Sequence, residues 1–285
     1  MALRFAHCSD IHLLNLEGIR PWDFLNKRIT GAVNLVLKRR RAHNDALFDR
    51  IVERAHELAV DRLVITGDLT NLALESEFTH VVKKLAGAGL PVTVIPGNHD
   101  AYTRGAARNG RFEIHFAPFM QGERAPGTEY PFIQRFEGVA LIGVSSAVPS
   151  LPLYATGFVG EAQLERLETM LQQLKQDGLA RVVLIHHPVI AGMSHKRHDL
   201  LDLEAFGRVI ASSGAELILH GHEHKALEGV LPGPEGMVPV HGVSSGTALS
   251  QKPGREGAFR IYDVDPGRLA DQVFTWRGED FAELS

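Results

Sequence analysis

Short apolar runs alternate with amphipathic segments along the first part of the chain. Apolar side chains dominate Leu3–Ser9, Arg62–Thr66 and Pro91–Ile95, which predicts three buried strands. Between these runs, Asn44–Ala59 and Glu75–Ala88 have the periodicity of amphipathic helices. Strands that alternate with helices in this way are typical of an α/β fold.

The second half continues the alternation. Pro131–Phe136 and Val139–Val144 flank Glu137-Gly138, which predicts a β-hairpin. No internal repeat or linker interrupts the pattern, so we expect residues 1–285 to form a single domain. The other elements that we expect are the helices Glu161–Gln176 and Leu203–Ser212 and the strands Arg181–Ile185, Glu216–Leu219, Met237–Val243, Gly257–Val264 and Asp271–Trp276.

Two segments depart from this pattern. Residues 104–128 are rich in Gly, Ala and Pro, which favours a lid or a surface excursion. Residues 21–41 combine apolar positions at helical spacing with basic side chains, so we expect a basic amphipathic insertion. Such a stretch can lie on an anionic membrane or accept a lipid-like substrate. It can equally be a helix that packs on the domain and has a solvated basic end.

Composition narrows the classes of protein. Hydrophobic residues make up 44% of the chain and charged residues 22%, as in ordinary globular proteins, and no apolar run is long enough to cross a bilayer. The formal net charge of −4 argues against broad binding of nucleic acid. The single cysteine, Cys8, excludes an internal disulfide and, with no signal-peptide pattern at the first residues, favours a cytoplasmic location, peripheral to a membrane if residues 21–41 bind one.

Polar clusters directly follow five of the strand-like runs. In an open α/β sheet, ligands bind beyond the carboxyl ends of the strands, so we expect these clusters to meet at one rim. The chain has 15 histidines, and several of them fall in these clusters. The clusters are Asp10-Ile11-His12, Gly67-Asp68, Gly97-Asn98-His99-Asp100, His186-His187-Pro188 and Gly221-His222-Glu223-His224.

The residue types in the clusters suit a pair of divalent cations. Carboxylate, amide oxygen and imidazole are ligands for Mn, Fe, Zn or Co, and the lack of thiolate argues against a structural zinc site. Residues two apart on an extended chain point the same way, so Asp10 and His12 are expected to face one cavity, as are His222 and His224. Taken alone, each motif is better explained by turn chemistry or by a partly buried histidine. All five in this order favour a metal centre.

In this order the clusters resemble the motif set of the calcineurin-like metallophosphoesterase superfamily, which reads D-x-H, G-D, G-N-H-D, H-x-P and G-H-x-H. The resemblance extends from Asp10 to His224 and thus covers most of the chain. It implies a four-layer αββα sandwich, in which two mixed β-sheets are flanked by helices. It also implies two divalent metal ions as cofactors.

The resemblance further implies a role for each motif residue. Asp68 would bridge the two metals, and His99 would be the catalytic histidine near the scissile bond, oriented by Asp100. His187 would pack beside the metal ligands or support them. The ligands of one metal would be Asp10, His12 and His224, and those of the other Asn98, His186 and His222.

The implied activity is that of a dinuclear metal-dependent phosphoesterase, which hydrolyses a phosphodiester by a metal-bridging hydroxide. Protein phosphatases of this superfamily carry G-D-x-x-D-R-G and G-N-H-E, whereas this chain has Gly67-Asp68-Leu69-Thr70-Asn71 and Asp100. The chain is therefore more similar to small bacterial phosphodiesterases, some of which act on cyclic nucleotides.

Two other functions stay open. One is a UDP-2,3-diacylglucosamine pyrophosphatase-like enzyme of lipid A synthesis, which the basic segment 21–41 favours, although the commonest such enzyme has Arg where His99 stands. The other is a catalytically inactive scaffold on the same fold that binds proteins. Relatives of that kind lose metal ligands, whereas this chain retains them all.

Residues outside the motifs carry weaker signals. Arg104, His195 and His198 are candidate substrate contacts, although a solvated loop explains them equally well. The remaining histidines, His43 among them, are expected to be surface or core residues. The sequence does not indicate an oligomeric state.

Overall fold

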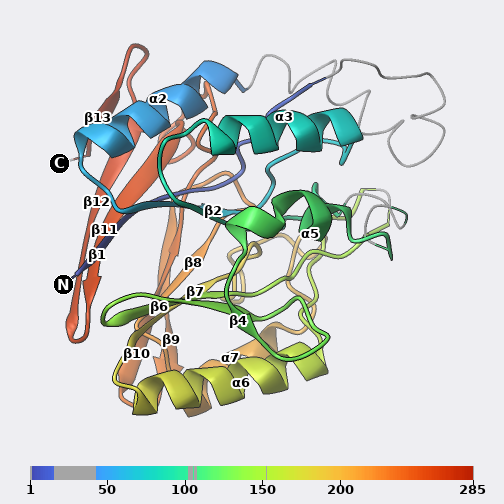
Figure 1. The fold of residues 1–285 in the computed structure, drawn as a ribbon, viewed down its shortest axis with the longest axis vertical. Coiled ribbons are helices and arrows are strands. Elements are labelled where there is room, and N and C mark those ends of the chain that lie inside the picture. Colours follow the sequence, from blue (N-terminus) through green and yellow to red (C-terminus); the bar gives the residue numbers. More distant parts are fainter. Residues whose placement is uncertain (1, 16–42, 102–104, 106–107, 152, 285) are drawn as a thin grey trace.

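The computed structural model describes residues 2–15, 43–101, 105, 108–151 and 153–284. The basic segment predicted at 21–41 and the candidate substrate contact Arg104 lie outside the described residues. Two β-sheets pack face to face, and helices cover the outer face of each (Figure 1). The predicted α/β sandwich of two mixed sheets flanked by helices is confirmed.

The first sheet has six strands in the order β13-β12-β11-β1-β2-β3. Its strands β1, β2 and β3 run parallel, and β11 joins β1 in the antiparallel sense. Helices α2 and α3 cover its outer face (Figure 1). The bounds are β1 Leu3–Cys8, α2 Asp45–Glu57, β2 Arg62–Thr66, α3 Glu75–Ala86, β3 Val92–Ile95, β11 Ala258–Asp265, β12 Arg268–Trp276 and β13 Phe281–Glu283.

The second sheet has seven strands in the order β4-β5-β6-β7-β8-β10-β9. Its central strands β6, β7, β8 and β10 run parallel, and the outer strands are antiparallel to their neighbours. Helices α6 and α7 cover its outer face (Figure 1). The bounds are β4 Glu123–Arg124, β5 Phe132–Arg135, β6 Val139–Gly143, α6 Glu161–Gln176, β7 Ala180–Leu184, α7 Leu203–Ser213, β8 Leu217–His220, β9 Leu227–Gly233 and β10 Gly236–Gly242.

Burial explains why these segments form the elements predicted. Strand β6 is buried along its whole length, as expected of a central strand between two layers. The apolar stripe of α6, formed by Leu164, Leu167, Leu171 and Leu174, faces the core beside the second sheet. The predicted hairpin is confirmed, since β5 and β6 pair in the antiparallel sense.

Two strands near the carboxyl end were missed. β9 alternates between half-buried and exposed positions and contains Pro232 and Gly233, which weaken a strand signal. β13 has only three residues. Both lie at the edges of their sheets, where burial imposes little pattern on the sequence.

The described part of the segment 104–128 packs on the domain. It forms the short helix α5 (Arg111–Phe116), the 3-10 helix η3 (Ala117–Phe119) and β4. Phe112 and Phe116 from α5 are buried in the core of the first sheet. These apolar anchors were missed, and a lid role for the segment stays a prediction. None of the helices in the described part of the chain combines the length and apolarity that crossing a bilayer requires.

Candidate metal centre

The five predicted clusters lie just beyond the carboxyl ends of β1, β2, β3, β7 and β8. Hydrogen bonds between the clusters show that they converge. The amide of His222 donates to Oδ2 of Asp10 at 2.9 Å. Nδ1 of His186 donates to the carbonyl of Thr66 at 2.7 Å, across from one sheet to the other. The rim predicted from the strand ends therefore exists.

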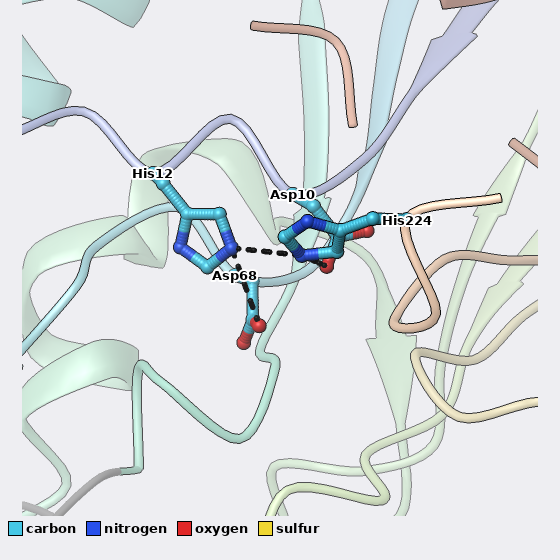
Figure 2. Close-up of side chains that lie close together, drawn as sticks. All are labelled: Asp10, His12, Asp68 and His224. Carbon is cyan, nitrogen blue, oxygen red and sulfur yellow. Dashed lines mark hydrogen bonds and ion pairs between the residues drawn. The ribbon is translucent and has the colours of Figure 1, made fainter. Parts of the chain in front are cut away.

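One group of side chains gathers around Asp10 (Figure 2). Nε2 of His224 is 3.2 Å from Oδ1 of Asp10 and 3.1 Å from Nε2 of His12. Nε2 of His12 is 3.8 Å from Oδ2 of Asp68. One ligand atom from each of these four residues lies within 4.8 Å of the others, which is compatible with a single cation between them.

A second group shares Asp68 with the first. Nε2 of His186 is 3.5 Å from Oδ1 of Asp68 and 3.2 Å from Oδ1 of Asn98. Nδ1 of His222 is 3.2 Å from the same Nε2 of His186. The two oxygens of Asp68 thus face different groups, so this carboxylate could serve both of them.

The atoms of both groups fit divalent cations. Imidazole nitrogens face each other at 3.1 Å between His12 and His224 and at 3.2 Å between His186 and His222. Two unprotonated nitrogens repel at this distance unless a proton or a cation lies between them. Oδ1 of Asp10 is buried and accepts no well-aligned hydrogen bond in the described chain, although Nε2 of His224 lies 3.2 Å away. A buried carboxylate oxygen without a partner is costly, and a cation would satisfy it.

Several of these residues have left-handed backbone. The φ angles are 52° for Asp10, 44° for His12, 53° for Asp68, 75° for His222 and 49° for His224. The extended-chain explanation for the paired residues was therefore wrong. Asp10 and His12 approach one point because both depart from the strand conformation. Such backbone is uncommon outside glycine, costs about 1–3 kcal/mol per residue and clusters at functional sites.

Three glycines lie beside the centre, and a side chain at each position would be excluded for a different reason. Gly67 has a φ of +95°, and a Cβ there would lie 2.6 Å from Nδ1 of His186. Gly97 and Gly221 lack left-handed backbone, but a Cβ on Gly97 would overlap the Asp68 carboxylate, and one on Gly221 would overlap the Ser9 hydroxyl. Tight turning explains Gly67, and close approach explains the other two.

Burial and opposite charges shift the pKa values of the buried groups. Burial disfavours charge on Asp68, yet the imidazoles of His186 and His99 outweigh it and hold the pKa of this carboxyl well below its usual range. Burial opposes the charged form of His186 too, but Asp68 raises its pKa to about 9. Burial, together with the neighbouring His187, holds the pKa of His222 well below its usual range. Binding of a divalent cation at His186 requires the loss of its proton.

His99 lies beside Asp68, and its orientation by Asp100 stays a prediction. The amide of His99 donates to Oδ1 of Asp68 at 2.8 Å, and its ring Nδ1 donates to the carbonyl of Asn71 at 2.6 Å. Asp100 accepts hydrogen bonds from the amides of Thr70 at 2.9 Å and Gly97 at 2.9 Å. Asp100 therefore joins the loops that carry Asp68 and Asn98, and Asn71 orients the His99 ring.

The candidate substrate contacts lie at different depths. His198 is beside the centre: its ring centroid is 5.7 Å from that of His222, and its carbonyl accepts from Nε2 of His222 at 3.1 Å. Its Nδ1 is 3.4 Å from Oε1 of Glu223. His195 is exposed, with its ring 6.2 Å from the His198 ring. His198 is thus the nearer of the two to the proposed ligands.

Some residues of the centre were missed. The His43 ring, expected at the surface or in the core, lies 5.1 Å from the His12 ring. Ser245 donates to the carbonyl of Asp10 at 2.7 Å, and Thr247 donates to that of Ile11 at 2.8 Å. The only sequence signal for these hydroxyls is the small polar run after the predicted strand Met237–Val243.

Comparisons with known proteins agree with this geometry. The sequence is 26% identical over 246 residues to a probable cyclic nucleotide phosphodiesterase of Rhodopseudomonas palustris, covering 84% of this chain and 76% of that protein. It is 25% identical over 198 residues to another from Psychrobacter, covering 65% of this chain and 53% of that protein. It is 27% identical over 179 residues to the 3',5'-cyclic adenosine monophosphate phosphodiesterase of Escherichia coli, covering 61% of this chain and 58% of that protein.

Solved structures show the same fold. A dimetal phosphatase from Danio rerio superposes with a TM-score of 0.65 at 15% identity, covering 99% of this chain and 98% of that one. A purple acid phosphatase from yellow lupin superposes with a TM-score of 0.62 at 13% identity, covering 99% of this chain and 53% of that one. The sequence profile of the calcineurin-like phosphoesterases matches residues 3–226, and the chain belongs to this family.

Proposed function

We propose that this chain is a metal-dependent phosphodiesterase that hydrolyses a cyclic nucleotide. The observation that carries the proposal is the convergence of two groups of oxygen and nitrogen ligands on the two oxygens of Asp68. Cyclic nucleotides are the substrates named for several relatives of similar sequence. This chain covers only part of the length of such relatives, and as little as 53% of one of them. The substrate is therefore inferred from the chemistry of the proposed metal ligands together with the sequence similarity.

The ligand assignment in this proposal follows the two groups. Asp68 would be shared by the two metal sites. Two bound divalent cations would lower the pKa of a water molecule and neutralise charge on phosphoryl oxygens. The donor set is harder than that of a thiolate site and fits Mn, Fe or Zn. Asp10, His12 and His224 would complete one metal site, and Asn98, His186 and His222 the other.

His99 is the proposed proton donor to the leaving oxygen. Its Nδ1–H is committed to the carbonyl of Asn71, so the ring would act as an imidazolium and give up a second proton carried on Nε2. Its amide bond to Asp68 keeps the ring beside the shared carboxylate. A positioned general acid of this kind contributes roughly 10²–10⁴-fold to a rate.

The test measures metal content and hydrolysis in the same preparations. Purified protein loaded with Mn²⁺ is expected to bind two equivalents, by elemental analysis, and to convert cyclic AMP to AMP. His99→Ala should keep both equivalents and lose about 10²-fold or more in kcat. Unchanged kcat in His99→Ala would contradict the role of His99. A protein that binds both metals and hydrolyses no phosphoester would favour the inactive scaffold.

A substrate panel separates the phosphodiesterase from the lipid A alternative. Cyclic AMP, a UDP-diacylglucosamine and a glycerophosphodiester are compared at equal metal loading. Preference for the UDP-lipid would overturn the cyclic nucleotide proposal and would support binding of residues 21–41 to lipid or to a membrane surface. Preference for cyclic AMP would support a small water-soluble phosphodiester as the substrate and is also compatible with the expected cytoplasmic location.

A further inference from the structure

Large apolar side chains are exposed on two loops, one between β6 and α6 and the other between β7 and α7. Leu153 is 78% exposed and Tyr154 is 42% exposed. Exposed apolar groups that gather in one region mark binding surfaces more often than single ones do. We call the set the Tyr154 patch; its members are Leu151, Leu153, Tyr154, Phe158 and Leu201.

Backbone hydrogen bonds join the two loops. The amide of Ala155 donates to the carbonyl of Arg197 at 2.9 Å, and that of Gly157 donates to the carbonyl of Asp199 at 3.1 Å. The amide of Leu201 donates back to the carbonyl of Gly157 at 2.9 Å. Tyr154 and Arg197 are therefore held in fixed relation to each other.

The joined loops accept hydrogen bonds directly from histidine rings at the metal centre. Nε2 of His187 donates to the carbonyl of Ala155 at 3.2 Å, and Nε2 of His222 donates to that of His198 at 3.1 Å. The rings of His187 and His222 are themselves 4.3 Å apart. Tyr154 and Arg197 are thus each one residue from a carbonyl that holds a ring of the centre.

Tyr154 and Arg197 present a cation and an aromatic ring together. Cζ of Arg197 lies 5.6 Å from the centroid of the Tyr154 ring. Within the described residues, no carboxylate forms an ion pair with Arg197. Its charge is therefore available to an anionic ligand. Leu153, which precedes the tyrosine, has a left-handed φ of 68°, a strained conformation for a branched residue.

We infer that Tyr154 and Arg197 form the subsite for the base of a nucleotide whose phosphate lies at the metal centre. This inference rests on the proposed function. A planar base can stack on the tyrosine ring, and the guanidinium favours both the aromatic ring and a nearby phosphate. An acyl chain would gain from the leucines but not from a cation over a ring.

The experiment measures binding of AMP and of ribose 5-phosphate to the Mn²⁺-loaded protein by calorimetry. Tyr154→Ala should weaken AMP about tenfold, within the range measured for bases stacked on aromatic side chains, and change ribose 5-phosphate less than about twofold. Tyr154→Phe, which keeps the ring, should bind AMP as the wild type does. Arg197→Gln should weaken AMP less than Tyr154→Ala does.

The outcomes separate the subsite from the activity. Equal weakening of AMP and ribose 5-phosphate, or no weakening of either, would overturn the base subsite even if the wild type hydrolyses cyclic AMP. Selective loss of AMP binding in Tyr154→Ala would support the subsite even if no hydrolysis is found. Octyl phosphate is the third ligand: if Tyr154→Ala weakens it and leaves AMP unchanged, the patch binds acyl chains and the inference is wrong.

Discussion

The two halves of the candidate metal centre differ in how firmly their histidines are held. In the half with Asn98, the His186 and His222 rings each donate to a backbone carbonyl, at 2.7 and 3.1 Å, and the His186 side chain is fully buried. In the half with Asp10, Nδ1 of the buried His12 ring likewise donates to the carbonyl of Thr70, at 3.2 Å, but the His224 side chain is 27% exposed. Its ring contacts the polar atoms of Asp10 and His12, which are themselves proposed ligands.

This difference has a physical consequence. Carbonyls that hold the far nitrogen of an imidazole fix its tautomer and orientation before a metal binds, which raises affinity. We therefore expect the half with His186 and His222 to bind its cation more tightly than the half with His12 and His224. Left-handed backbone does not distinguish the two halves, because His222 has a φ of 75° and His224 has one of 49°.

Removal of the shared ligand should have the largest effect. Asp68→Ala takes an oxygen from both halves, so we expect both cations to be lost and phosphodiester hydrolysis to fall to background. Elemental analysis and hydrolysis of bis(p-nitrophenyl) phosphate measure these effects. Asp177→Ala is the control, since this exposed carboxylate pairs only with surface groups such as Arg135. If Asp68→Ala retains both metals, the two halves do not share this carboxylate.

Filling the space beside Asp68 should have the next largest effect. A Cβ at Gly97 would overlap the Asp68 carboxylate, so Gly97→Ala should displace it, lower metal content and destabilise the fold by about 1–3 kcal/mol. Gly207→Ala is a matched control. Gly207 lies in α7, where an added Cβ would meet no atom within 4 Å and the φ is not left-handed, so alanine should stabilise the protein by roughly 0.4–1 kcal/mol. Equal unfolding midpoints in urea for both variants would contradict the overlap.

Acid should lower the free energy of unfolding, because two buried histidines close to the metal centre stay neutral in the folded protein. Burial, helped by His186, lowers the pKa of His187 to about 3, and burial lowers that of His220 to about 4. The unfolded chain, with pKa values near 6.5, binds more protons between pH 6.5 and 4. Each of these histidines should therefore lower stability by about 1.4 kcal/mol per unit as pH falls through this window. Asp100, whose pKa burial and the Asp68 carboxylate raise to about 7, opposes the contribution of one such histidine.

Urea unfolding of the metal-free protein at several pH values measures this slope. His186, whose pKa is raised to about 9, is protonated in both states well below pH 6.5 and adds little slope there. His187→Gln should therefore reduce the slope by about one group's share. A slope that is the same in the wild type and His187→Gln would show that His187 titrates normally in the fold.

Loss of supporting hydrogen bonds should have the smallest effects, one in each half. The side-chain amide of Asn71 donates to the carbonyl of His12 at 2.7 Å. In the other half, Glu223 pairs with His198, whose carbonyl accepts from the His222 ring. Asn71→Ala should weaken the cation of the His12 half about tenfold, and Glu223→Gln should weaken the other a few-fold. Chelator competition resolves the two affinities. Weakening of the same site in both variants would contradict the separation of the halves.

Local patterns in the sequence predicted the strands, the helices and the positions of the polar clusters. Periodicity sufficed for β1, α6 and the hairpin of β5 and β6, because each of these elements buries a regular set of side chains. The convergence of the clusters was predictable because parallel strands in a sheet end on the same side. The edge strands β9 and β13 were not predictable from pattern, since their side chains are only partly buried.

The sequence by itself determined which side chains reach the rim between the sheets, because those residues directly follow buried strands. Only the tertiary structure decided their backbone conformation and their partners. Asp10 adopts left-handed backbone while its amide donates to the carbonyl of Gly67, and Asp100 accepts from the amide of Thr70. These partners are tens of residues apart in the chain, so no local pattern of side chains encodes them.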